Sequence, residues 1–261
     1  NPVSESRRKW YNQSTAPEDA YVTHQEWDRN EHPELSLEHG ERISMFLDCS
    51  LNDDSTALVA CRISDGFVKP LGLWQKPAGE RGKDWRVPRE SVDDVVRTAF
   101  HTYDVVGFFG DPSHVLDSET GLRYWDALFD RWHRDYGRRL KTWAVPSGRD
   151  RHAVMFDMIN TDIQRRFVTA VDQAYTDITE GDFPHDGDAR LRLHMLNARR
   201  QPTRVGMSIA KESRESKRKI DLAICAIGAR MVRREYLNRN SRSGGGQLWL
   251  SLIHISEPTR P

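Results

Sequence analysis

The sequence ISMFLDCSLNDDSTALVAC occupies residues 43–61 and sets the topology of the domain. It contains two apolar runs, Ile43–Asp48 and Thr56–Ile63, joined by the turn-forming residues NDDS. A third apolar run, Phe67–Gln75, follows the turn sequence SDG. Three short strands joined by tight turns predict an antiparallel meander at the start of the domain.

Helical and extended patterns alternate after this meander. A helix is expected from Pro88 to near Tyr103, followed by a strand over Val105–Phe109. A strand, a crossover helix and a second strand favour a parallel addition to the sheet. Further expected elements are a helix over Tyr124–Tyr136, a strand over Leu140–Val145, a helix from about Asp150 to Ile178, a helix with the sequence LRLHMLNARR (191–200), a strand over Val205–Ala210 and a helix from about Lys217 to Tyr236.

This order of elements predicts an α/β protein whose mixed sheet starts as an antiparallel meander, continues with parallel strands and is flanked by helices. It is the order of the RNase H-like fold, and another mixed α/β sheet with the same elements is the alternative. In the RNase H-like arrangement the first and fourth strands are parallel neighbours. Residues at the ends of these two strands should therefore lie close together.

Three aspartates stand where these elements end or begin. Asp48 ends the first strand, Asp111 follows the strand in YDVVGFFGDPSHV (103–115), and Asp221 opens the helix in KRKIDLAICAIGARM (217–231). A carboxylate at the end of an apolar strand is costly without a cation nearby. The three acids therefore indicate a metal site, whereas strand-end turns and a helix first-turn acid are the structural alternatives.

Composition limits the classes of protein that this chain can be. Its 261 residues, 37% of them apolar, suffice for one substantial core. The net charge is formally zero, but residues 189–242 hold fifteen Lys and Arg against four Asp and Glu. Such a segment is either a phosphate-binding surface or a solvated helix face. The three cysteines lack metal-ligand or disulfide-framework spacing, and no apolar run is long enough for a membrane helix.

The two ends of the chain differ in character from the middle. Residues 1–41 begin with a polar, Trp-containing stretch that we interpret as a linker leaving another domain, and residues 42–240 as the folded domain. Residues 241–261 contain a Gly-rich break and the sequence LSLIHISEPTRP, which is similar to the translation of a sequencing adapter. We expect this tail to be dispensable.

Four segments resemble the nuclease domain of large terminase subunits from tailed phages. They are MFLDCSLNDDSTALVACRISDG (45–66), VVGFFGDPSHV (105–115), LRLHMLNARR (191–200) and GMSIAKESRESKRKIDLAICAIGARMV (206–232), and the resemblance covers about residues 7–240. It implies an endonuclease that cuts concatemeric double-stranded DNA in the host cytoplasm, with a packaging ATPase preceding residue 1. It also implies the small terminase subunit and the portal protein as partners.

The resemblance also assigns roles to residues. Asp48 would bridge two Mg²⁺ or Mn²⁺ ions, with Asp111 and Asp221 completing the two coordination shells. Hard cations of this kind prefer carboxylate oxygen, and two ions can stabilise both the attacking and the leaving oxygen. His194 corresponds to a position near the catalytic pocket of some members, where it could assist proton transfer; a core or surface histidine is the alternative.

Basic residues near these acids are candidates for contacts with the DNA backbone. Lys211 could contact the scissile phosphate, or be a solvated strand-end lysine. The other candidates are Arg199, Arg200, Arg214, Lys217, Arg218 and Lys219.

Two other functions are compatible with the pattern. A Holliday-junction resolvase or transposase would share the fold and the acids. A non-catalytic module that clamps DNA or docks on a capsid would use the acids structurally, and would bind no Mn²⁺ through Asp48.

Overall fold

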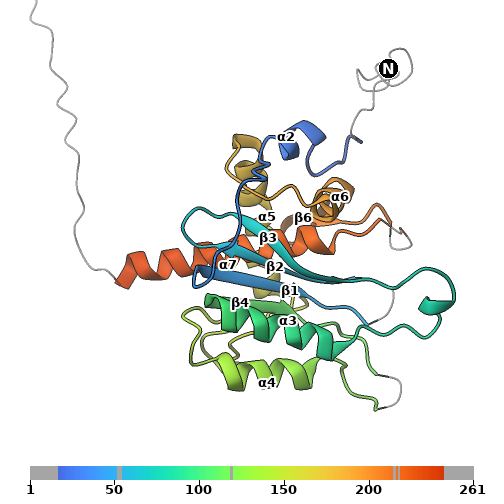
Figure 1. The fold of residues 1–261 in the computed structure, drawn as a ribbon, viewed down its shortest axis with the longest axis vertical. Coiled ribbons are helices and arrows are strands. Elements are labelled where there is room, and N and C mark those ends of the chain that lie inside the picture. Colours follow the sequence, from blue (N-terminus) through green and yellow to red (C-terminus); the bar gives the residue numbers. More distant parts are fainter. Residues whose placement is uncertain (1–16, 52–54, 118–119, 214–215, 217, 244–261) are drawn as a thin grey trace, which may run out of the picture.

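The first apolar run forms the centre of a four-stranded sheet (Figure 1). The computed structural model describes residues 17–51, 55–117, 120–213, 216 and 218–243. Its strands are β1 (Arg42–Asp48), β2 (Thr56–Arg62), β3 (Val68–Trp74), β4 (Asp104–Asp111), β5 (Arg199–Thr203) and β6 (Gly206–Ala210). Its helices are α2 (His24–Asp28), α3 (Arg89–Thr102), α4 (Asp126–Tyr136), α5 (Thr161–Glu180), α6 (Ala189–Asn197) and α7 (Asp221–Ser243), with a 3-10 turn η1 (Gly79–Gly82).

The sheet has the order β3-β2-β1-β4, and it is mixed as expected. β1 pairs antiparallel with β2, and β2 pairs antiparallel with β3, so the meander is confirmed. β4 returns through α3 and pairs parallel with β1, which brings Asp111 level with Asp48. Among the described strands, β5 and β6 form a separate hairpin.

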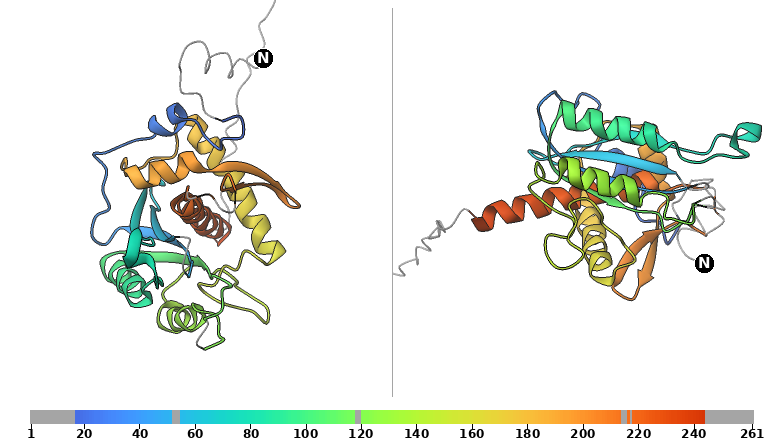
Figure 2. Two further views of the ribbon diagram at one scale, coloured as in Figure 1. Left: turned by 90° about the vertical axis from the view of Figure 1, so that its right-hand side faces the viewer. Right: turned by 90° about the horizontal axis from the view of Figure 1, so that it is seen from below.

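Alternate residues of β1 face the two sides of the sheet. On one side, Met45 and Leu47 join a core cluster with α3 and α4. On the other side, Phe46 joins a larger cluster with α5, α6 and α7. Figure 2 shows α7 lying against the sheet, with α5 on its outer side. Both faces are therefore covered, as the continuous apolar sequence of β1 requires.

A glycine lets α7 lie close to β1. A Cβ atom added to Gly228 would come within 2.3 Å of the Phe46 ring. The Ser44 hydroxyl also donates to the Ala229 carbonyl oxygen, at 2.8 Å. This close contact holds α7 against β1 at Gly228 and Ala229.

The segment after α4 differs from our expectation. The strand expected over Leu140–Val145 is wrong: Lys141 N and Thr142 N donate to Val106 O at 2.8 and 3.0 Å, and the segment then leaves β4. The helix expected from Asp150 begins instead at Thr161, because the Asn160 side chain accepts hydrogen bonds from the first backbone N–H groups. Among the intervening residues, Met155 forms an isolated β-bridge with Gly110, and Gly110 N donates to Val154 O at 2.9 Å.

Residues 17–41, which precede β1, pack on the domain, and the boundary expected at residue 42 stays a prediction. Trp27 is fully buried and stacks on His185, and the Tyr21 hydroxyl donates to Val171 O at 2.7 Å. Residues 1–16 and the tail from 244 lie outside the described residues. Within the described part of the chain, no helix has the length and apolar character needed to cross a membrane.

Candidate metal centre

The carboxyl ends of β1 and β4 place two carboxylates side by side. Asp48 and Asp111 are Cα partners in the parallel ladder, and Cys49 N donates to Asp111 O just beyond it, at 3.1 Å. Asp221 is the first residue of α7 and is only 5% exposed. The helix start lies over the same end of the sheet, so the three acids come from two strands and one helix, as the sequence predicted.

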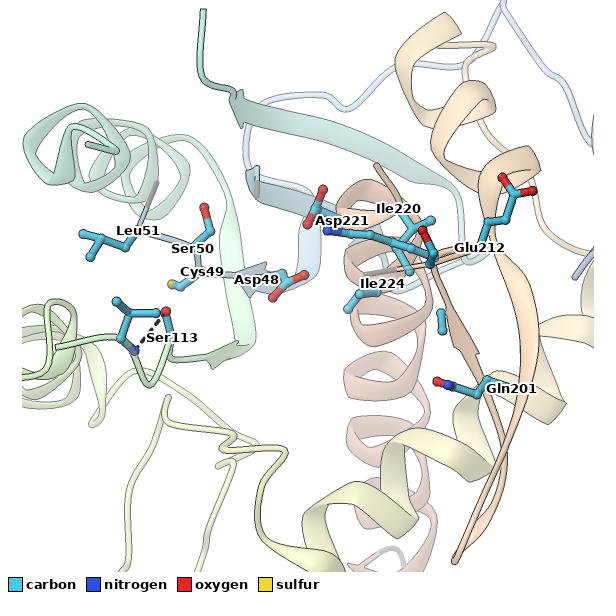
Figure 3. A pocket seen from close by; sticks show the side chains of 14 residues that line it. Asp48, Cys49, Ser50, Leu51, Ser113, Gln201, Glu212, Ile220, Asp221 and Ile224 are labelled. Atoms are coloured by element: carbon cyan, nitrogen blue, oxygen red, sulfur yellow. Dashed lines mark hydrogen bonds between the residues drawn. The ribbon is translucent and has the colours of Figure 1, made fainter. Parts of the chain in front are cut away.

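A cavity of about 740 Å³ opens at this end of the sheet. Asp48 and Asp221 line it, together with Ser50, Ser113 and Lys211. Figure 3 shows the two carboxylates near its centre, with Ser113 on one side and Gln201 and Glu212 of the β5–β6 region on the other. The cavity walls thus contain several oxygen donors and a lysine.

Asp111 is not among the residues that line this cavity. Burial raises the pKa of its carboxyl to about 7; the Met158 N–H, which donates to Oδ1 at 3.0 Å, opposes this rise, and the Asp157 carboxylate adds to it. A carboxylate with such a raised pKa gains more from a nearby cation than an exposed one does.

Asp48 affects the pKa of both buried thiols near the ends of the two strands and the start of α7. Burial raises the pKa of Cys49 and of Cys225 well above the usual range. Asp48 and Asp111 raise the pKa of Cys49 further, whereas Asp48 and Asp221 do so for Cys225. Asp48 thus shares one buried thiol with Asp111 and the other with Asp221.

The donor set fits a hard divalent cation. Carboxylate oxygens from three elements suit Mg²⁺ or Mn²⁺ better than the softer metals that prefer thiolate. Among the described residues, however, no three His, Cys, Asp or Glu side chains are already grouped closely enough to hold an ion. An ion would thus have to draw these carboxylates together.

His194 is buried beside the start of α7, one residue from Asp221 along the chain it contacts. It is 2% exposed, is not among the residues lining the cavity, and burial lowers its pKa to about 4. Its Nδ1 accepts a hydrogen bond from Leu222 N at 3.0 Å. Leu222 follows Asp221, so the neutral imidazole caps the first turn of α7.

The candidate DNA-binding residues separate into groups. Lys211 lines the cavity, Lys219 is half-buried, and Arg218 is exposed and pairs with Glu212 at 3.4 Å. Arg200 is exposed and lies over the Tyr175 ring. Arg214 and Lys217 lie outside the described residues.

Arg199 faces the core instead of solvent. It is 6% exposed, donates to the Leu196 and Ala198 carbonyl oxygens and forms an ion pair with Asp19 at 3.6 Å. Its guanidinium is therefore engaged within the protein, and a contact with the DNA backbone stays a prediction for this residue.

Sequence reasoning did not identify the Asp157 region. Asp157 Oδ1 lies 2.8 Å from His114 Nε2 and accepts a hydrogen bond from Ile159 N at 3.0 Å. It thus stabilises the loop in which the Met158 N–H donates to Asp111 Oδ1. The sequence pattern predicts a helix around Asp157, and only the Asn160 cap signal indicates a loop here.

Comparisons with known proteins extend these observations. No protein-family model matches the chain. Its sequence is 38% identical to the Gene 13 proteins of Mycobacterium phages L5 and D29, over 259 residues in each case. The matches cover 94% of this chain and 40% of each phage protein. The chain therefore spans about two fifths of the length of these curated relatives.

Solved structures share the fold. The large terminase nuclease of thermophilic phage G20c with bound magnesium has a TM-score of 0.50 at 10% identity, covering 84% of this chain and 98% of that one. The large terminase of bacteriophage HK97 has a TM-score of 0.52 at 16% identity, covering 82% and 43%. The chain thus has the fold of large terminase nuclease domains, and the predicted RNase H-like mixed sheet is confirmed.

Proposed function

We propose that this chain is the metal-dependent endonuclease domain of a phage DNA-packaging terminase and that it cuts concatemeric double-stranded DNA. One observation carries the proposal. Asp48 and Asp111 lie level at the ends of two adjacent parallel strands, and Asp221 of α7 lines the same cavity as Asp48. The fold shared with large terminase nucleases, one of them with bound magnesium, supports it.

The three aspartates would hold two Mg²⁺ or Mn²⁺ ions, with Asp48 shared between them. Two ions supply an activated water and stabilise charge on both the attacking and the leaving oxygen. The protein residues prepare the site for this chemistry. Asp111 is oriented by the Met158 N–H, and Asp221 is held at the start of a helix that His194 caps.

The other lining residues would position the DNA. Lys211 lines the same cavity as Asp48 and Asp221, and it would contact a backbone phosphate beside them. Phosphate contacts orient the duplex without reading its sequence, so we expect cleavage that is largely independent of sequence.

The wider assignments follow from the same proposal. Residues 17–243 would form the nuclease unit of a longer protein, and an ATPase domain would precede it. The protein would act in the host cytoplasm with the small terminase subunit and the portal protein.

The test is cleavage of plasmid and linear duplex DNA by the Asn variants at positions 48, 111 and 221, singly and together. Each single variant should lose most of its Mg²⁺- or Mn²⁺-dependent cleavage, and the triple variant should lose little more, because the residues act as one unit. Asp104→Asn is the matched control, since Asp104 lies at the opposite end of β4.

Three results would contradict the proposal. They are cleavage that persists in EDTA, cleavage that requires zinc, and near-parent cleavage by all three single variants while they remain folded.

A further inference from the structure

Among the described strands, one edge of β4 pairs with no other strand of the sheet, and the segment 137–156 bonds to this edge at two places. Lys141 N and Thr142 N bond to Val106 O near the beginning of β4. Phe156 N bonds to Gly110 O at 2.7 Å near its end, one residue before Asp111. Figure 2 shows this segment between α4 and α5. It therefore connects the far end of β4 with the candidate metal centre.

This segment and the end of α4 are strongly basic. Residues 131–151 contain six Arg and one Lys against two Asp, in a chain whose formal net charge is zero. Three of the arginines have structural partners: Arg131 pairs with Asp93 at 2.7 Å, Arg134 pairs with Asp135 at 3.8 Å, and Arg139 donates to Phe100 O at 2.8 Å. The remaining charges are not needed to hold these elements together.

Four of the remaining basic residues are exposed, and α7 adds a fifth. The four have no ion pair with any residue in the part of the chain that the structure describes. Arg239 of α7 donates to the Lys141 carbonyl oxygen at 3.3 Å, which brings one more positive charge to the same edge. We call these five residues the basic strip: Arg138, Lys141, Arg149, Arg151 and Arg239.

The surface along the strip is hollowed. One cavity of about 570 Å³ is lined by Arg138 and Trp143, and another of about 680 Å³ by Arg149, Arg151 and Asp157. Both cavities are also lined by Asp130, and Arg151 lies 4.4 Å from the centre of the Trp143 ring. The two hollows adjoin, and the second reaches the loop that contacts Asp111.

We propose that the basic strip binds the phosphate backbone of the DNA that the metal centre cuts, at a position several base pairs from the cut. This inference rests on the proposed function. Strand geometry places the level of Val106 about 17 Å from that of Asp111, a distance of about five base pairs of duplex. Arginine, whose planar fork matches phosphate oxygens, predominates in the strip. An elongated row of charges suits a continuous polyanion better than a compact acidic patch on a protein.

The experiment compares the parent chain with a strip variant in which Arg138, Arg149 and Arg151 are replaced by Gln. Binding of a duplex of about 30 base pairs is measured by fluorescence anisotropy in EDTA over a range of salt concentrations. Each lost phosphate contact should reduce the slope of log K against log salt by about 0.9, so we expect a reduction of about 2–3. At physiological salt the affinity should fall about 10-fold or more.

The matched control neutralises the same amount of charge elsewhere. Arg29, Arg97 and Arg190 are exposed residues beside α2, on α3 and on α6, and replacing them with Gln should change the slope by less than about 1. A second strip variant, with Lys at the three positions, keeps the charge and should retain most of the slope. Melting temperatures confirm that all variants are folded.

Binding and cleavage distinguish the two proposals. With saturating DNA and Mg²⁺, the strip variant should keep the parent's maximal cleavage rate and show only a raised KM for DNA. A parent that binds no DNA, or a strip variant with the parent's affinity and slope, overturns this inference even if metal-dependent cleavage is intact. The inference is also overturned if the strip variant loses affinity for poly-glutamate but not for DNA. That result would indicate an acidic protein partner. If the parent cuts no DNA but binds DNA through the strip, only the nuclease assignment is overturned.

Discussion

Burial raises the pKa of the Asp111 carboxyl to about 7, and the stability of the metal-free protein therefore depends on pH. The unfolded chain ionises this carboxyl near pH 4, whereas the folded chain keeps its proton until about pH 7. Unfolding therefore releases a proton between these two values. The free energy of unfolding falls as the pH rises through this window and stays lowered above it.

Asp111→Asn should accordingly stabilise the metal-free protein at pH 8 and have little effect at pH 4. The amide keeps an oxygen for the Met158 N–H and removes the buried charge. We expect a melting temperature roughly 3–6 °C higher at pH 8 in EDTA, measured by calorimetry. Mg²⁺ should stabilise the parent but not the variant. Equal melting temperatures of parent and variant at pH 8 would show that the carboxylate is not destabilising.

Asp157 is a positioning residue for Asp111, because it holds the loop that presents the Met158 N–H. Asp157→Asn weakens the contact with His114 while leaving the metal-binding carboxylates in place. The Mg²⁺ concentration for half-maximal cleavage should rise about 10-fold, as is typical when a group supporting a metal ligand is changed. DNA affinity in EDTA should not change.

Asp162→Asn is the control for this variant, since the Asp162 side chain is 85% exposed on the first turn of α5. If the two variants require the same Mg²⁺ concentration, Asp157 has no positioning role.

At the scale of whole elements, the position of α7 determines where Asp221 lies. Its first turn is buried and bonded to α6 through His194, whose lowered pKa keeps the imidazole neutral near pH 7. A neutral ring that already accepts a backbone N–H cannot also take a proton from water during the reaction. The structure therefore favours a capping role for His194 over proton transfer.

His194→Leu should lower the melting temperature, because it leaves a buried helix N–H without its acceptor at a cost of about 1–3 kcal/mol. His194→Asn places a side-chain oxygen near the position of Nδ1 and should restore most stability and cleavage. The pH–rate profile of the Asn variant should match that of the parent. Loss of one limb of the profile, with a fall in rate of about 100-fold or more, would instead support general acid–base catalysis.

At the scale of the whole molecule, one buried arginine joins three layers. Arg230 of α7 is 2% exposed. It donates to Gly66 O in the β2–β3 turn at 2.9 Å, to Asp177 Oδ2 of α5 at 2.6 Å, and to Asp182 O at 2.8 Å. Arg234 also pairs with Asp177. These bonds hold α5 and the sheet on opposite sides of α7.

Arg230→Met should lower the free energy of unfolding by about 3 kcal/mol, because breaking a buried ion pair leaves polar groups without partners. Arg165→Met removes an exposed pair with Asp162 and should cost about 0.5 kcal/mol or less. Urea denaturation measures both values. Similar costs for the two variants would mean that Arg230 contributes no more than a surface residue. Cleavage well below the melting temperature should be kept, since Arg230 does not line the metal centre.

Local sequence was sufficient to recognise the meander, the crossover helix and the three aspartates. Apolar runs such as Ile43–Leu47 have a period set by the backbone, and turn residues mark their ends within a few positions. The parallel pairing of β1 with β4 then follows from the right-handed crossover through α3. For this reason the proximity of Asp48 and Asp111 could be predicted from the order of elements.

Features that depend on contacts between distant residues were not predictable in this way. Arg199 belongs to a basic sequence but is buried against Asp19, and the residues before Thr161 have a helix-like pattern but pair with Gly110. His194 became a helix cap because α6 packs against the start of α7. In each case, the free energy of a buried hydrogen bond or ion pair with a remote partner outweighs the local preference of the chain, and only the folded structure shows which partner that is.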